Sequence, residues 1–248
     1  ADKALVVPTT HDEPPLQMQA FDDVFQCPRA LLVNTPEERE LIEKRYDAPS
    51  RRRVVGVGLD VPPQLDLAGF RQRYSVSGDY VLYLGRLEAG KGVDQLVRLH
   101  AQAARKSAEV PELLLAGAGD LRVSGRRVRA LGRLSEVDRW AALAGAQATV
   151  IPSRYESLSL IAVESLAVGS PILVNRESTV LMGHVQRSGA GAAFDAGFAK
   201  VGHDDPRLVM EVGFDVVGVG VGGVLGASEG VDVRVRISGH GESFLKTG

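Results

Sequence analysis

The sequence predicts an α/β protein that contains a doubly wound parallel sheet and, before it, the end of a second α/β unit. From residue 80 to residue 174, short apolar runs alternate with stretches of helical periodicity, a pattern typical of βαβ units. Polar or Gly-rich loops directly follow several of these runs. Because open α/β sheets bind ligands at the carboxyl ends of their strands, we expect a ligand site along that edge.

The N-terminal 62 residues carry the elements of the smaller unit, and a Gly- and Pro-rich segment at 56–66 predicts the crossing to the larger one. Pro36 suits the first helical position, because its missing N–H has no partner there. We expect strands at 4–7, 30–33 and 53–55 and a helix at 37–46.

The larger unit is expected to span residues 63–194. Its predicted strands lie at 80–84, 113–116, 128–131, 148–151 and 172–174, with helices at about 93–106 and 136–143 and a further helix near 160–169. Between 175 and 194 we expect another helix and a last short strand. Residues 195–248 form an atypical Gly- and Val-rich tail, in which 231–237 could be one alternating strand. For this tail we favour a piece of an incomplete gene over a flexible extension or an added β element.

Composition excludes several classes of protein. The 248 residues carry a net charge of −2, so no overall basic field favours nucleic acid. Cys27 is the single cysteine, which excludes an internal disulfide framework and fits a reducing compartment. No run of 18 apolar residues occurs, and the N-terminus lacks the pattern of a signal peptide. We therefore expect a cytoplasmic protein.

The stretch 151–174 contains two carboxylates, Glu156 and Glu164. Its residue order predicts a strand, a loop and a short helix, with Ser157 or Ser159 as the N-cap. Glu156 would lie in the loop and Glu164 a little over one turn inside the helix, so both could face one ligand with paired hydroxyls. From spacing alone, a solvated loop acid and a surface helix acid remain an alternative.

A second cluster follows the strand at 80–84. Gly85 suits a tight turn, and Arg86 and Lys91 flank the start of the next helix. A fork-shaped guanidinium, a compact ammonium and a helix N-terminus together favour phosphate, although in isolation both could be ordinary loop residues. The segment Gly117-Ala-Gly119 is a weak match to a dinucleotide fingerprint, because Arg122 stands where Gly or Ala is wanted. No Asp-x-Asp pair indicates a metal.

Two motifs resemble the retaining glycosyltransferases of family four, which have the two-domain GT-B fold. The first is Pro-Ser-x-x-Glu, seven residues and then Glu-Ser-Leu-Ala-x-Gly-x-Pro, from Pro152 to Pro171; the second is Gly-Arg-Leu-x-x-x-Lys-Gly at 85–92. The resemblance covers about residues 5–194 and implies a Rossmann-like donor domain. One departure is that Ser157 and Ser159 stand where the family usually has glycines, which alone tolerate positive φ without steric cost.

The resemblance implies transfer of a sugar from a UDP- or GDP-linked donor to an acceptor, with retained configuration and without a cofactor or metal. It implies catalytic roles for Arg86, Lys91 and Glu156. It also implies that Glu164 binds the ribose hydroxyls of the nucleotide. His11 matches a histidine that touches sugar or acceptor. The acceptor could be a saccharide, a lipid-linked saccharide or a small molecule, and a lipid would allow peripheral membrane association. The implied donor-binding residues are Gly85, Ser157, Leu158, Ser159, Leu160 and Glu164.

Two alternatives stay open at this point. A chain that lacks most of one domain could be a non-catalytic remnant that only binds nucleotide sugars. Another GT-B enzyme, such as an epimerase or a phosphorylase with a pyridoxal cofactor, would share the donor domain.

Overall fold

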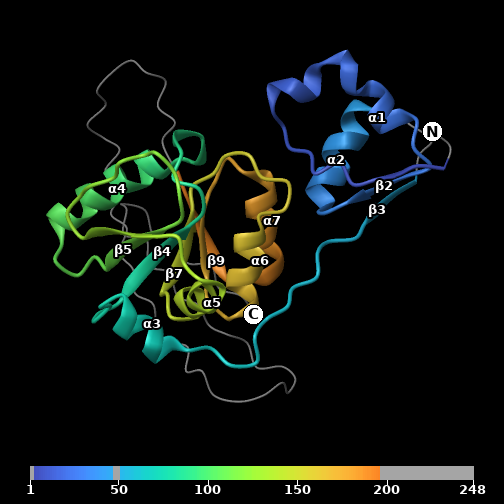
Figure 1. The fold of residues 1–248 in the computed structure, drawn as a ribbon. Coiled ribbons are helices and arrows are strands. Elements are labelled where there is room, and N and C mark those ends of the chain that lie inside the picture. The colour runs from blue at the N-terminus through green and yellow to red at the C-terminus, as the bar shows by residue number, and fades with distance from the viewer. Residues whose placement is uncertain (1–2, 47–50, 196–248) are drawn as a thin grey trace, which may run out of the picture.

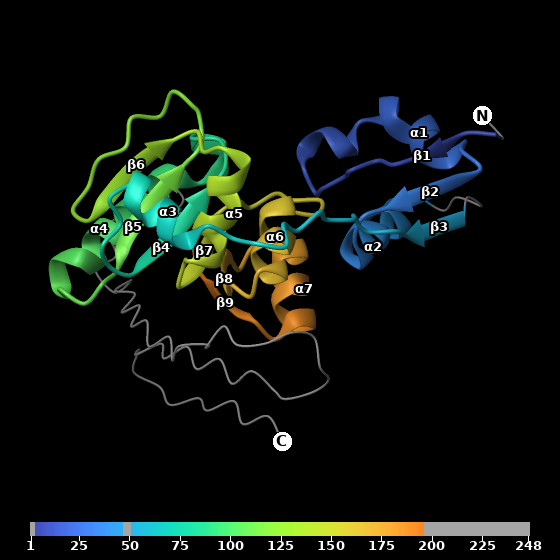
Figure 2. The same ribbon diagram turned by 60° about the horizontal axis from the view of Figure 1, so that its bottom comes forward.

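The computed structural model describes residues 3–46 and 51–195, so the predicted strand at 231–237 and all but the first residue of the tail lie outside it (Figures 1 and 2). The described residues form a three-stranded sheet of order β1-β2-β3 and a six-stranded sheet of order β6-β5-β4-β7-β8-β9. All the strand pairs are parallel. The predicted α/β class with a doubly wound parallel sheet is confirmed.

The smaller sheet consists of β1 (Leu5–Val6), β2 (Ala30–Val33) and β3 (Arg51–Val54). After β2, α2 (Pro36–Arg45) begins where Thr35 accepts a hydrogen bond from the Glu38 N–H, and Pro36 occupies the first turn as predicted. The sequence did not predict the short helices η1 (Pro14–Gln17), η2 (Gln19–Phe21) and α1 (Asp22–Gln26). Phe25 of α1 stacks on Tyr46 with ring centroids 4.6 Å apart, which closes the core of this unit.

Five strands of the larger sheet agree with their predicted bounds to within a residue, and the last short strand expected after residue 175 is β9. Its strands are β4 (Tyr80–Leu84), β5 (Glu112–Ala116), β6 (Val128–Gly132), β7 (Ala148–Ile151), β8 (Ile172–Asn175) and β9 (Gly191–Phe194). Its helices are α3 (Leu67–Arg73), η3 (Ala89–Lys91), α4 (Val93–Lys106), α5 (Glu136–Ala144), α6 (Leu160–Ala167) and α7 (Thr179–Ser188). Of these, α3 and η3 were not predicted.

Helices cover both faces of the larger sheet, which explains why β4 is apolar throughout. Val81 and Tyr83 pack with α4 in one cluster, whereas Tyr80 and Leu82 pack with α3 and α5 in another. Successive side chains of a strand point to opposite faces, so each face receives every second residue. This packing fixes the carboxyl ends of the central strands.

The strand order places a crevice between β4 and β7. From β4 the chain winds outward through β5 to β6, then returns to the other side of β4 and continues through β7, β8 and β9. In doubly wound sheets, ligands bind outside the carboxyl ends of the strands at such a reversal. The loops after β4 and β7 therefore face one another across the expected site.

The two sheets are joined by an extended segment, which runs from β3 past α6 to α3 (Figure 2). They also touch through side chains: Arg187 of α7 pairs with Glu37 of α2, and the Thr35 hydroxyl donates to the Ser157 carbonyl at 3.2 Å. The first residues of α2 thus lie against the loop that follows β7. The domain boundaries near residues 62 and 194 stay predictions.

Candidate functional site

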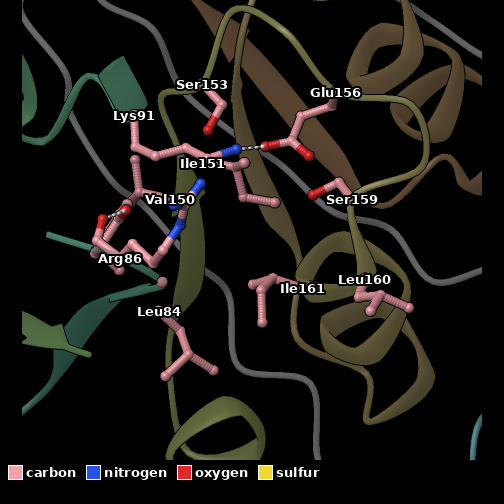
Figure 3. A pocket seen from close by; sticks show the side chains of 12 residues that line it. Leu84, Arg86, Lys91, Val150, Ile151, Ser153, Glu156, Ser159, Leu160 and Ile161 are labelled. Carbon is pink, nitrogen blue, oxygen red and sulfur yellow. Dashed lines mark hydrogen bonds and ion pairs between the residues drawn. The ribbon is translucent and has the colours of Figure 1, made fainter. Parts of the chain in front are cut away.

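A pocket occupies the crevice between β4 and β7 (Figure 3). It is walled by the ends of both strands, by the loop 85–92 after β4 and by the loop 152–159 after β7, and the first residues of α6 close one side. The structure thus brings together six of the residues singled out from the sequence, namely Gly85, Arg86, Lys91, Glu156, Ser159 and Leu160.

The loop after β4 is fixed largely through its backbone. The Gly85 N–H donates to the Ala116 carbonyl at 3.0 Å, and the Leu87 N–H donates to the Ala118 carbonyl at 2.9 Å. From β4, the Tyr83 hydroxyl donates to the Arg86 carbonyl at 2.7 Å. Burial raises the pKa of Tyr83, and the nearby Glu156 carboxylate raises it further, so this phenol keeps its proton. The turn therefore has a defined shape before any ligand binds.

Two glycines allow the turn after β5 to lie directly against the loop 85–92. A Cβ on Gly117 would lie 1.8 Å from the Gly85 carbonyl oxygen, and one on Gly119 would lie 2.3 Å from the Leu87 oxygen. Both have φ values, +146° and +158°, that other residues rarely adopt. The Gly-Ala-Gly segment thus supports the neighbouring loop instead of forming a dinucleotide fingerprint of its own.

The cations of this loop differ in their surroundings. Arg86 is 70% exposed and pairs with Glu88 at 3.2 Å, whereas Lys91 is only 31% exposed. The Lys91 ammonium reaches across the pocket to the Glu156 carboxylate, 3.1 Å away and 17% exposed (Figure 3). One positive group therefore stands at the rim, and a second is fixed inside by the opposite loop.

The loop after β7 leads into α6 with an unusual backbone. Ser159 occupies the N-cap position at φ 62° and ψ 84°, in the left-handed region, and its side chain makes no cap hydrogen bond. Of the two predicted N-cap residues, Ser159 is confirmed at that position, although its hydroxyl does not cap the helix as a serine N-cap usually does. Within the described residues, no hydrogen bond is made by the four backbone N–H groups from Leu158 to Ile161. These donors and the helix dipole make this end of α6 attractive to an anion.

The carbonyl groups of the same loop are bound by distant side chains. Besides the Thr35 bond to Ser157, His184 of α7 has its Nε2 2.6 Å from the Leu158 oxygen. The Asn175 amide donates to the Pro152 oxygen at 3.1 Å. Ser157 and Leu158, predicted as donor-binding residues, are not among the described residues that line the pocket, whereas Glu156 and Ser159 on either side of them are.

Glu164 lies one turn into α6 and is buried, with its side chain 8% exposed. It pairs with Arg139 of α5, whose guanidinium also lies over the Trp140 ring, 5.0 Å from the centroid. Glu164 is not among the described residues that line the pocket. Sequence analysis missed Arg139, since nothing in the periodicity of the helix marks which arginine meets a carboxylate of another helix.

His11 follows β1 in the smaller unit and lies beside the second loop. Its ring is 6.1 Å from that of Tyr155, the residue before Glu156, and its Nδ1 is 3.6 Å from Glu13. The adjacent turn is tied to α2, because the Thr10 N–H donates to the Glu38 carboxylate. Burial raises the pKa of Glu38 despite this bond. His11 thus lies near the pocket without being among its described lining residues.

Neither a metal centre nor a membrane span emerges from the residues that the structure describes. No group of three or more His, Cys, Asp or Glu side chains in those ranges could hold a metal ion. Of the described helices, none combines the length and apolar character needed to cross a bilayer.

Residues 71–200, more than half of the chain, match the family described as Glycosyl transferases group 1. The chain belongs to this glycosyltransferase family. The family resemblance drawn from the motifs is thereby confirmed. The chain is 30% identical over 230 residues to the D-inositol 3-phosphate glycosyltransferase of Acidothermus cellulolyticus, covering 81% of this chain and 48% of that protein. It spans about half the length of the curated relatives it matches.

Solved structures of glycosyltransferases share the fold. WaaG, a glycosyltransferase involved in lipopolysaccharide biosynthesis, superposes with a TM-score of 0.60 at 17% identity, over 73% of this chain and 54% of WaaG. The structure of Anabaena HepE in complex with UDP and glucose superposes with a TM-score of 0.56 at 16% identity, over 73% of this chain and 55% of HepE. At these identities the likeness concerns the fold.

Proposed function

We propose that this chain carries the donor site of a retaining glycosyltransferase, which moves a sugar from a nucleoside diphosphate sugar to an acceptor. The observation that carries the proposal is the pocket at the sheet reversal, where Arg86 and Lys91 lie opposite the start of α6, whose first N–H groups make no hydrogen bond to any described residue. Family membership, together with the UDP in the HepE complex, supports UDP as the first nucleotide to test.

The chemical task of this site is to let the diphosphate leave. Negative charge develops on the distal phosphate as the bond to the sugar breaks, and fixed donors aimed at that position stabilise it. Lys91 is held in place by Glu156, and Arg86 is exposed and able to fold onto a ligand. With two protein cations and a helix N-terminus available, the site has no need of a divalent metal.

The two carboxylates are assigned to different parts of the donor. Glu156 lines the pocket beside Lys91 and would accept hydrogen bonds from hydroxyl groups of the sugar. Glu164 would accept hydrogen bonds from the ribose hydroxyls, because Arg139 engages its Oε2 and no hydrogen bond to its Oε1 is found in the described part of the chain. His11 would touch the sugar or acceptor from the smaller unit.

The phosphate assignment is tested by calorimetry with UDP and UMP. The chain should bind UDP more tightly, and Arg86→Ala should cost about 1.5–3 kcal/mol of UDP binding, the range of a charged hydrogen bond. Arg98→Ala is the matched control, since Arg98 is an exposed arginine of α4 that pairs with Asp94. A chelator should leave the affinity unchanged. Equal affinity for the two nucleotides, or a large loss on chelation, would contradict the proposal.

Transfer is a separate question from donor binding. It is tested with UDP-glucose and D-inositol 3-phosphate, the acceptor in the name of the relatives, and product formation would support the enzyme. Tight UDP binding without any turnover of the sugar nucleotide would favour the alternative of a non-catalytic nucleotide-sugar binder.

A further inference from the structure

Two side chains from outside the loop 152–159 bind consecutive carbonyl groups within it. His184, on α7, lies with its Nε2 2.6 Å from the Leu158 oxygen. Thr35, at the start of α2 in the smaller unit, donates its hydroxyl to the Ser157 oxygen at 3.2 Å. Neither residue is among the described residues that line the pocket, so their contribution is to the loop itself.

Each of these hydrogen bonds has a fixed direction. Burial lowers the pKa of His184, so the imidazole is neutral near pH 7, and the carbonyl partner requires the proton on Nε2. Thr35 is 1% exposed, and its oxygen already accepts the Glu38 N–H at 3.1 Å. Its only proton is therefore committed to the Ser157 carbonyl.

Fixing a carbonyl also fixes the N–H group of the next residue. The described residues contain no cis peptide bond, and in a trans peptide the N–H points opposite to the C=O. The bond from Thr35 thus directs the Leu158 N–H, and the bond from His184 directs the Ser159 N–H. Successive N–H groups around a left-handed residue, such as Ser159 at φ 62°, form a concavity that binds anions.

We propose that His184 and Thr35 are positioning residues that hold the Leu158 and Ser159 N–H groups toward the distal phosphate of the donor. This proposal rests on the proposed function, because it requires a diphosphate in the pocket. Since Thr35 belongs to the smaller unit, that unit takes part in donor binding as well as in any contact with the acceptor.

The test for His184 compares UDP and UMP affinities of the full chain by calorimetry. His184→Phe keeps a ring of similar size without the donor, and the loss of one neutral hydrogen bond should lower UDP affinity about fivefold while UMP affinity changes less. His184→Gln places an amide donor near the position of Nε2 and should restore most of the lost preference for UDP. A purely structural role would lower both affinities by the same factor.

For Thr35, the substitutions are Val and Ser. Thr35→Val removes the bond to Ser157 and also the N-cap of α2, whereas Thr35→Ser keeps both. Ser135→Ala removes the N-cap of α5, where Ser135 accepts the Asp138 N–H and donates to the Asp138 carboxylate, and its thermal unfolding gives the scale of losing a capping hydroxyl away from the pocket. The ratio of UDP to UMP affinity should fall about fivefold in Thr35→Val and stay unchanged in Thr35→Ser and Ser135→Ala.

The outcomes separate this inference from the proposed function. If the unchanged chain binds UDP no better than UMP, the phosphate site itself is wrong. If it prefers UDP, and His184→Phe and Thr35→Val keep that preference in full, the phosphate site stands and the positioning role is overturned.

Discussion

The two loops that face each other across the pocket are built by different means. The loop 85–92 rests on neighbouring backbone: the Gly85 N–H bonds to the last residue of β5 and the Leu87 N–H to the turn after it, which comes close because Gly117 and Gly119 have no side chains. The loop 152–159 is held by side chains that are 122, 26 and 23 residues away in the sequence, from Thr35, His184 and Asn175. Backbone contacts shape the cationic wall, and distant side chains shape the wall of N–H donors.

This difference decides how each loop should respond to mutation. A contact between two backbone segments cannot change without moving both segments, because protein interiors are close-packed. A hydrogen bond from a side chain can be removed singly, at a cost of about 1 kcal/mol. The cationic loop should therefore fail as a unit, whereas the second loop should lose its function in steps.

The largest effect is expected from Gly117→Ala. The added methyl would lie 1.8 Å from the Gly85 oxygen and would occupy a backbone conformation with φ +146°. Strain of this kind should lower the free energy of unfolding by about 3 kcal/mol and displace the loop that carries Arg86. Chemical denaturation measures the first effect, and UDP titration measures the second.

Gly78→Ala is the matched control for that change. A Cβ on Gly78 meets nothing within 4 Å, so this variant should unfold and bind like the original chain. A Gly117→Ala variant with unchanged stability would mean that the two turns do not depend on each other, and the contrast between the loops would lose its basis.

Intermediate effects are expected from the two carboxylates. Glu164→Gln should weaken UDP and UDP-glucose alike by about 1–2 kcal/mol, because the ribose is common to both, whereas Glu156→Gln should weaken only UDP-glucose. Calorimetry with both ligands gives the comparison. The amide oxygen of Gln can still accept the hydrogen bond from the Lys91 ammonium, so UDP affinity should be kept in Glu156→Gln. Equal losses of UDP affinity in both variants would contradict the assignment of one carboxylate to each half of the donor.

The sequence predicted the elements with a regular hydrophobic pattern and the site residues that belong to continuous motifs. Every strand of the larger sheet and helices such as α4 (Val93–Lys106) follow from hydrophobic spacing, and Arg86, Lys91 and Glu156 follow from motifs that lie directly after strands. Short helices such as α3 (Leu67–Arg73), with seven residues, offer too few turns to show a period.

Contacts between distant elements leave no trace in a local pattern. Arg139, Thr35 and His184 each meet the stretch 157–164 from another element, and each is an ordinary helical or capping residue in its own segment. Sequence analysis could therefore locate the second loop but not the side chains that hold it.

The smallest effect is expected from Ser159→Gly. A non-glycine residue at φ 62° carries about 1 kcal/mol of strain, which Gly would relieve, but Gly also loses more entropy on folding by a similar amount. Stability should therefore change by less than about 1 kcal/mol. UDP affinity should also stay the same, because Gly keeps the N–H, and because Thr35 and His184 hold the peptide planes whatever residue stands at 159.

Ser159→Ala keeps the backbone strain and removes the hydroxyl, so it separates the two. Both variants should bind UDP within about twofold of the original chain, a difference of about 0.4 kcal/mol. Weaker binding in both variants would mean that the hydroxyl itself contacts the donor. If only the Gly variant weakened, the left-handed residue would need the stiffness of a side chain, and the loop would depend on its own local conformation as well as on the distant side chains.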